Sequence, residues 1–145
     1  MNFAEADKIL TEYLAANWTT TPIAWPNIEG RDFSVAGHPL LPTGTADYVA
    51  FRTHGAGSRT VTVDGRCIRY SSQLFVAVCV KEGTGVRAAR GHLDGLILLL
   101  ENKTLSGNSG TIRMGTITGP VDYVAPNGWF VSEVGVMYHY ERYAG

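Results

Sequence analysis

The residues best placed to do chemistry form a glycine-rich turn in the middle of the chain. The segment from Gly83 to Ala88, GTGVRA, fits the pattern G-x-G-x-x-G/A, follows an apolar strand and begins a predicted helix. Backbone amides at such a helix start can hold a phosphate. Against a dinucleotide site, no parallel βα units follow, and the acidic residue at the expected distance, Glu101, falls at a helix end. We expect a tight turn with Thr84 as N-cap, and keep a small ligand- or nucleotide-binding protein as the alternative.

Other residue types that support catalysis or metal binding show no recognisable grouping. The histidines fall in two loops, a helix and a strand, without metal-ligand spacing: His38, His54, His92 and His139. No serine lies in G-x-S-x-G. Cys67 and Cys79 are separated by about 40 Å if the chain between them is extended, so we expect two core residues and no disulfide. The sequence predicts no enzyme, no cofactor and no metal.

The elements that must position these residues are two helices and several strands. The apolar strand from Gln73 to Val80 precedes a helix whose apolar stripe is Val86, Ala89, Leu93, Leu96, Ile97 and Leu100. A first amphipathic helix runs to about Trp18. A further strand is expected at 47–53, where the segment 54–58 ends it. Another is expected at 111–118, with a continuation through 121–124. The last strand is expected at 129–140, and the side chains on its helix-facing side are Phe130, Val134, Val136, Tyr138 and Tyr140. The prediction is an α+β fold, an antiparallel-rich mixed sheet with two helices packed on it.

The loops between these elements carry further expectations. Asp64-Gly65, between Thr60 and Tyr70, predicts a protruding β-hairpin with a type I′ turn, whose second arm continues into the following strand. The segment from Leu105 to Gly110 is expected to be a flexible loop. The irregular segment from Ile28 to Ala46 is long for a compact domain, which is typical of a functional or mobile loop.

Composition limits the class of protein. A length of 145 residues predicts one domain, 1–145. Charged residues make up only 17%, which favours a surface partly covered by a partner, and the net charge of −1 gives no overall attraction to nucleic acid or an anionic membrane. We find no pattern of a signal peptide or membrane span, and expect a cytoplasmic protein.

Several short motifs together resemble one family. The motif AWPN at Ala24 to Asn27, shortly after the first helix, resembles a signature of the tailed-bacteriophage tail terminator proteins. The similarity continues in the strand and turn from Phe75 to Gly85, the RAAR segment from Arg87 to Arg90, and the Gly-Trp strand from Gly128 to Val136. This resemblance implies a virion protein of the tail and neck, assembled in the host cytoplasm. It implies a ring, commonly a hexamer, that caps the tail tube, ends tube polymerisation and forms the head-tail joining surface.

The resemblance also implies partners, and the residues themselves indicate candidate interfaces. The expected partners are further copies of the chain, the tail tube protein and a head-completion or connector protein, without membrane or sequence-specific nucleic-acid binding. A related neck protein, or a tail tube protein from the same assembly, which would form open polymers, is a further alternative. Trp25 could instead cover the core, and the first helix could cover Leu98 and Leu99. The candidate interface residues are Trp25, Pro26, Asn27, Phe33, Arg59, Asp64, Gly65, Arg66, Arg69, Leu98 and Leu99.

Overall fold

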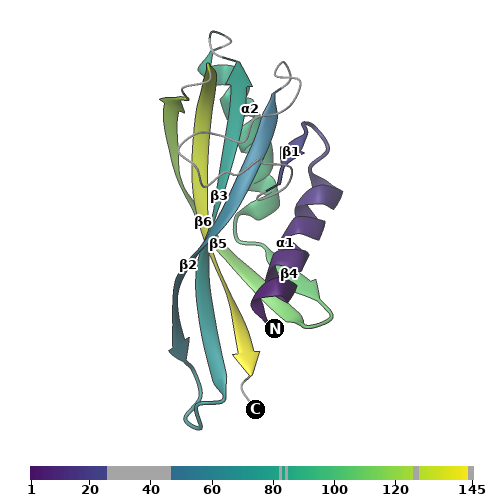
Figure 1. The fold of residues 1–145 in the computed structure, drawn as a ribbon, viewed down its shortest axis with the longest axis vertical. Coiled ribbons are helices and arrows are strands. Elements are labelled where there is room, and N and C mark those ends of the chain that lie inside the picture. The colour runs from purple at the N-terminus through teal and green to yellow at the C-terminus, as the bar shows by residue number, and fades with distance from the viewer. Residues whose placement is uncertain (26–46, 82, 84, 126–127, 144–145) are drawn as a thin grey trace.

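In the computed structural model, two helices pack with a six-stranded mixed sheet (Figure 1), which confirms the predicted α+β fold. The structure describes residues 1–25, 47–81, 83, 85–125 and 128–143. The elements in chain order are α1 (Phe3–Asn17), β1 (Ile23–Ala24), β2 (Tyr48–Thr60), β3 (Cys67–Lys81), α2 (Val86–Leu100), β4 (Thr104–Gly107), β5 (Gly110–Val124) and β6 (Trp129–Tyr143).

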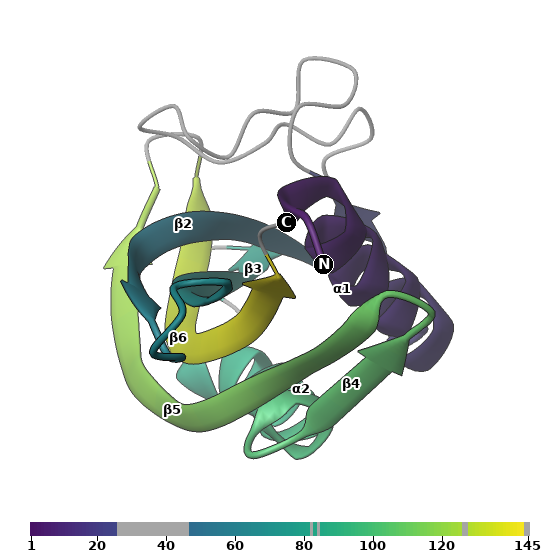
Figure 2. The same ribbon diagram turned by 90° about the horizontal axis from the view of Figure 1, so that it is seen from below.

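The sheet has the strand order β1-β2-β3-β6-β5-β4. Every pairing is antiparallel except that of β1 with β2, which is parallel. The strands curl into a half-barrel, and α1 lies across its open side (Figure 2). β1 spans only two residues, and the sequence analysis did not predict it. So short a strand has no measurable apolar period, which explains the omission.

The main core lies between the helices and the inner face of the sheet. The buried residues of α1 are Ala6, Leu10 and Leu14, and those of α2 are Ala89, Leu93, Leu96 and Leu100. They meet Val134, Val136, Tyr138 and Tyr140 of β6, so the face predicted for the last strand is confirmed. Phe3, the first residue of α1, lies outside this core: it is 59% exposed and meets Tyr70 edge-on at a centroid distance of 5.1 Å.

One strand is longer than predicted from the sequence, and one strand replaces a predicted loop. The segment from His54 to Ser58 does not end β2, because the extra residue between Gly55 and Gly57 is accommodated as a bulge and pairing with β3 continues to Thr60. The expected flexible loop from Leu105 to Gly110 is also wrong. Thr104–Gly107 forms β4, which pairs with the first residues of β5 through a tight turn. β5 continues beyond Gly119 to Val124, as predicted.

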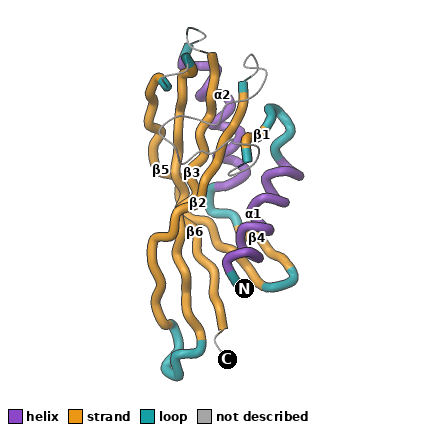
Figure 3. The backbone as a smooth tube through the Cα atoms, viewed as in Figure 1, coloured by secondary structure: helices purple, strands orange, loops and turns teal. Residues whose placement is uncertain are grey.

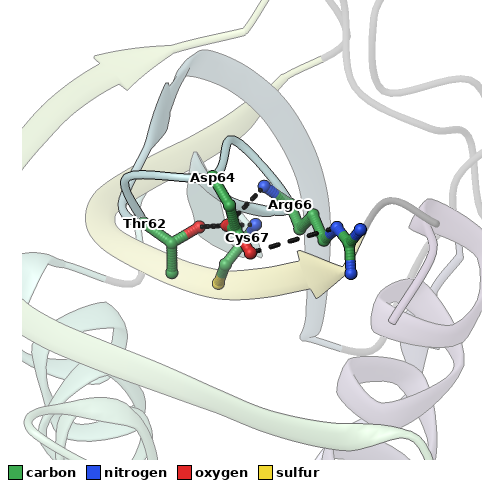
Figure 4. A network of polar contacts seen from close by, with 4 residues as sticks. All are labelled: Thr62, Asp64, Arg66 and Cys67. Atoms are coloured by element: carbon green, nitrogen blue, oxygen red, sulfur yellow. Dashed lines mark hydrogen bonds and ion pairs between the residues drawn. The ribbon is translucent and has the colours of Figure 1, made fainter.

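The β2–β3 hairpin protrudes beyond the helices at the bottom of Figure 1, as predicted, but its turn is not type I′. Gly65 has a φ of +73°, whereas Asp64 is not in the left-handed region that a type I′ turn requires at both central residues. Gly65 N donates to the Thr62 carbonyl at 3.2 Å. Asp64 Oδ1 accepts from Thr62 Oγ1 at 2.7 Å and from Arg66 N at 3.1 Å (Figure 4). Side-chain bonds of Thr62 and Asp64 therefore shape the turn.

Candidate assembly surfaces

The sheet has two edges at which part of a strand lacks a strand partner among the described residues. β2 pairs with β1 only at Val49 and Ala50, so along 53–60 its outer edge has no strand partner in the described part of the chain. β5 pairs with β4 only from Gly110 to Arg113, so its outer edge from 118 to 124 is open as well (Figure 3). Open strand edges present unpaired backbone amides and carbonyls, to which another chain can add. These two edges lie at opposite sides of the sheet.

The open part of β5 is apolar. The exposed fractions of its side chains are 64% for Val121, 37% for Tyr123 and 54% for Val124. The same stretch contains Pro120 and Asp122, residue types with which natural sheets protect an edge, yet its three apolar side chains remain exposed. An exposed run of this kind is typical of a surface that another molecule covers.

Asp122 fixes this edge to the rest of the fold. Its carboxylate accepts from the buried Ser132 hydroxyl and also pairs with Arg90 of α2. The Ser132 hydrogen bond, and then Arg90, hold the pKa of the Asp122 carboxyl below its usual range. Asp122 is therefore bonded to β6 through Ser132 and to α2 through Arg90.

The second surface is a three-stranded arm formed by the ends of β2, β3 and β6 that project away from the helices (Figure 3). Its tip carries three predicted interface residues, Asp64, Gly65 and Arg66, together with the fully exposed Val63. Arg66 forms an exposed ion pair with Asp64 at 3.9 Å. The bond from Thr62, and then that from the Arg66 amide, lower the pKa of Asp64.

The predicted interface residues Arg59 and Arg69 lie directly opposite one another on the arm. Arg69 is in turn opposite Glu141, and its Nη2 donates to Glu141 Oε1 at 2.7 Å. Arg69 Nε is buried without a partner. Arg59 is exposed and has no ion-pair partner in the described ranges. The structure thus brings these two arginines together on one face.

The remaining predicted interface residues separate into two groups. Trp25 is half-buried and meets Phe51 edge-on at a centroid distance of 5.0 Å, so it covers the core. Leu98 is 75% exposed on α2, whereas Leu99 packs against the core and its carbonyl accepts from Tyr13 Oη at 2.7 Å. Helix α1 therefore covers Leu99 and leaves Leu98 open. Pro26, Asn27 and Phe33 lie outside the described residues, as does the segment from Ile28 to Ala46.

The glycine-rich turn differs from the sequence expectation. Gly85, not Thr84, is the N-cap of α2; its φ is +90° and no side chain caps the helix. Glu101 does not face this turn, because its carboxylate accepts from Ile117 N at 3.0 Å. The strands that follow α2 form the antiparallel hairpin β4–β5 and not a parallel βα unit. The turn therefore lacks the surroundings of a dinucleotide site.

The thiols and imidazoles lie apart. Cys67 and Cys79 are free and buried, as expected, and burial raises the pKa of Cys79 to about 12, where a thiol is not a nucleophile. His92 Nε2 lies 3.2 Å from Asp47 Oδ2 and joins α2 to the start of β2. Within the described ranges, no cluster of three His, Cys, Asp or Glu side chains could hold a metal. His38 lies outside those ranges.

One pair of functional candidates escaped the sequence analysis. Arg113 of β5 lies directly opposite His139 of β6, on the same sheet face as Arg69. Neither residue belongs to a motif. Their proximity depends on the register of two strands, which single-strand periodicity does not give. In the part of the chain that the structure describes, no helix is long and apolar enough to cross a membrane.

Comparison with known proteins supports the fold alone. No protein-family model matches the sequence, and neither does any curated protein. One solved structure is similar over 94% of this chain and 90% of its own, with a TM-score of 0.63 and 20% sequence identity. Its designation states neither an activity nor a partner. At this level of identity, the likeness indicates a shared architecture and leaves function open.

Proposed function

We propose that the chain is a structural virion protein that assembles as a ring, caps the phage tail tube, ends tube polymerisation and forms the head-tail joining surface. The motifs from Ala24 to Asn27, Phe75 to Gly85 and Arg87 to Arg90 supply the family resemblance. The observation that carries the proposal is the pair of open strand edges on opposite sides of one sheet.

A ring built head to tail needs two different patches on each subunit. The β5 edge is apolar through Val121 and Val124, whereas the β2 edge is polar and glycine-containing from His54 to Thr60. Contact between the β5 edge of one copy and the β2 edge of the next would satisfy backbone groups and bury apolar surface at the same time. The exposed Leu98 and the tip of the arm remain for the tail tube protein and the connector.

The first test is the oligomeric state of the whole chain. Light scattering over a concentration series, with negative-stain images, should show a discrete ring, which we expect to be a hexamer. Val121→Lys places a charge on the apolar edge and should return the protein to monomers. Ala16→Lys, on the exposed side of α1, adds the same charge away from the sheet edges and should leave the ring intact.

The second test is function on the tube. Adding the protein to polymerising tail tube protein should stop elongation, and Val121→Lys should abolish this effect while circular dichroism shows an intact fold. Open filaments of the chain itself would contradict the cap and favour the tail tube alternative, because the same two patches give filaments when the rotation does not close. Monomers that also fail to stop tube growth would contradict both.

The ligand-binding alternative has one observation in its favour. Because the N-cap residue Gly85 has no side chain, it leaves the first backbone amides of α2 uncapped by that residue, and a helix start of this kind can hold an anion. A nucleotide that binds there should raise the melting temperature, and above its dissociation constant this increase should grow with the logarithm of ligand concentration. Stabilisation by NAD or ATP in a protein that does not self-associate would favour this alternative over the ring.

A further inference from the structure

A cleft opens beside the arm, where β5 and β6 part. β5 pairs with β6 only from Arg113 onward, because its first residues, Gly110 to Ile112, turn away to pair with β4. The space between the two strands measures about 240 Å³. Thr111 and Arg113 form one wall, and His139 and Glu141 form the other.

Positive charge exceeds negative charge around this cleft. Glu141 is already bound by Arg69 at 2.7 Å, so that pair is close to neutral. Arg113 is exposed at the cleft and has no ion-pair partner among the residues described. Arg59 adds a further positive charge to the same face. The cleft therefore holds a guanidinium without a fixed counter-ion.

Burial and this excess of positive charge both act on His139. Its pKa lies below the ordinary value, first because the imidazole is partly buried and then because of Arg69 and Arg113; Glu141 opposes these effects, and Arg59 adds slightly to them. Met1 also lines the cleft, and its amino group donates to the Glu141 carbonyl at 3.5 Å. On α1, Glu5 interacts with Ser109 at the end of the cleft and with the Asn2 amide. Glu5 is thus already engaged in capping α1.

We propose that this cleft binds a small phosphate-bearing dianion, such as a phosphomonoester or pyrophosphate. A dianion would be balanced by Arg113 and by His139 once the imidazole is protonated, whereas a single carboxylate would leave one of these charges uncompensated. Arg113 offers a planar fork of donors, and the Thr111 hydroxyl and the imidazole add further donors from both walls. The site goes beyond the proposed ring and does not depend on it.

The test follows His139 by NMR in the whole protein while pyrophosphate is added at constant ionic strength. Binding should raise the apparent pKa of His139 by about one unit, because the bound anion favours the imidazolium. Affinity should accordingly increase as the pH falls. A parallel titration with a phosphomonoester would identify which class of phosphate the cleft prefers.

Two arginine variants separate a built site from general charge. Arg113→Gln should weaken pyrophosphate binding by about 10-fold or more. Arg142 lies on β6 but does not line the cleft. Arg142→Gln therefore removes the same charge outside the cleft and should leave binding unchanged. Each variant is checked for its fold by circular dichroism, and Arg113→Lys offers a second probe that keeps the charge but loses the fork.

Three results would overturn the proposal. The first is no change at His139 with millimolar pyrophosphate, and the second is an equal loss of affinity in both glutamine variants. The third is binding of a short DNA duplex that exceeds pyrophosphate binding and falls steeply with salt, since this would indicate an open electrostatic face and not a cleft for a small anion. None of these results depends on whether the ring forms.

Discussion

Arg69 on β3 and Glu141 on β6 lie directly opposite each other, and Arg69 Nη2 donates to Glu141 Oε1 at 2.7 Å. This bond is the largest reason why the pKa of Glu141 is lowered from its ordinary value of 4.5. The two side chains are 31% and 37% exposed. The pair joins the two long strands of the arm at a point where solvent still weakens its attraction.

Replacing this carboxylate should therefore have a small effect that depends on pH. Glu141→Gln should lower the free energy of unfolding at neutral pH by about 0.2–1 kcal/mol. Because the pKa of Glu141 is lower in the folded state, its stabilisation is present above pH 4.5 and is lost as the pH falls through the folded-state pKa. Urea unfolding of both proteins at neutral and acidic pH measures the difference. A difference that grows on acidification would contradict the assignment.

Asp122→Asn tests the link between β5 and the rest of the fold. The substitution weakens the bond from the buried Ser132 hydroxyl and the ion pair with Arg90. Because hydrogen bonds to charged groups are stronger than neutral ones, we expect a loss of about 1.5–3 kcal/mol in the free energy of unfolding. The lowered pKa of Asp122 means that this stabilisation is also lost below the ordinary Asp value of 3.8. Chemical denaturation across acidic pH measures both effects.

A double-mutant cycle provides the control for Asp122. Ser132→Ala alone removes the donor. The double variant should lose less free energy of unfolding than the sum of the losses in the two single variants. Strictly additive losses would show that Ser132 and Asp122 act independently, in contradiction to their contact.

The long apolar elements could be predicted from the sequence because each has its own period. The α2 stripe of Ala89, Leu93, Leu96 and Leu100, and the alternation along β6, depend only on neighbours in the chain. The end of β2 could not be predicted in this way. Its second half, from His54 to Thr60, has little apolar alternation and is held in the sheet by pairing with β3, a contact between distant parts of the sequence.

The surfaces could be predicted only in part. Asp64-Gly65 indicated the protruding hairpin, and that hairpin brings Arg59 opposite Arg69. The side-chain bonds of Thr62 and Asp64 nevertheless select a different turn from the type I′ turn expected from the dipeptide. The cleft of Arg113 and His139 depends on where β5 leaves β6, and no local pattern marks that point.

Gly107→Ala tests the contact of α1 with β4. A Cβ at Gly107 would lie 2.7 Å from Ile9 Cδ1 and 2.8 Å from Ile9 Cγ1, so α1 or the Ile9 side chain must move. We expect a loss of about 1–3 kcal/mol, as is usual for overpacking, measured by urea unfolding. Gly55→Ala is the matched control, because no atom lies within 4 Å of its added Cβ. In an Ile9→Ala background, Gly107→Ala should no longer lower the free energy of unfolding. If it still does, the loss arises from the backbone and not from contact with Ile9.

Leu96 and Leu98, two residues apart on α2, separate folding from assembly. Leu96 is fully buried, so Leu96→Ala should lower the free energy of unfolding by about 2–5 kcal/mol. Leu98 is 75% exposed, so Leu98→Ala should change it by no more than about 0.5 kcal/mol.

The same Leu98 variant should show its effect when a partner is present. If Leu98 meets the tail tube protein or the connector, Leu98→Ala should weaken that binding in a pull-down or titration while the melting temperature stays near that of the unaltered chain. If the Leu98→Ala variant binds both partners with unchanged affinity, then Leu98 does not belong to the assembly surface. Val121→Lys would then decide whether the β5 edge alone accounts for self-association, because an exposed apolar residue contributes to binding only where it is covered.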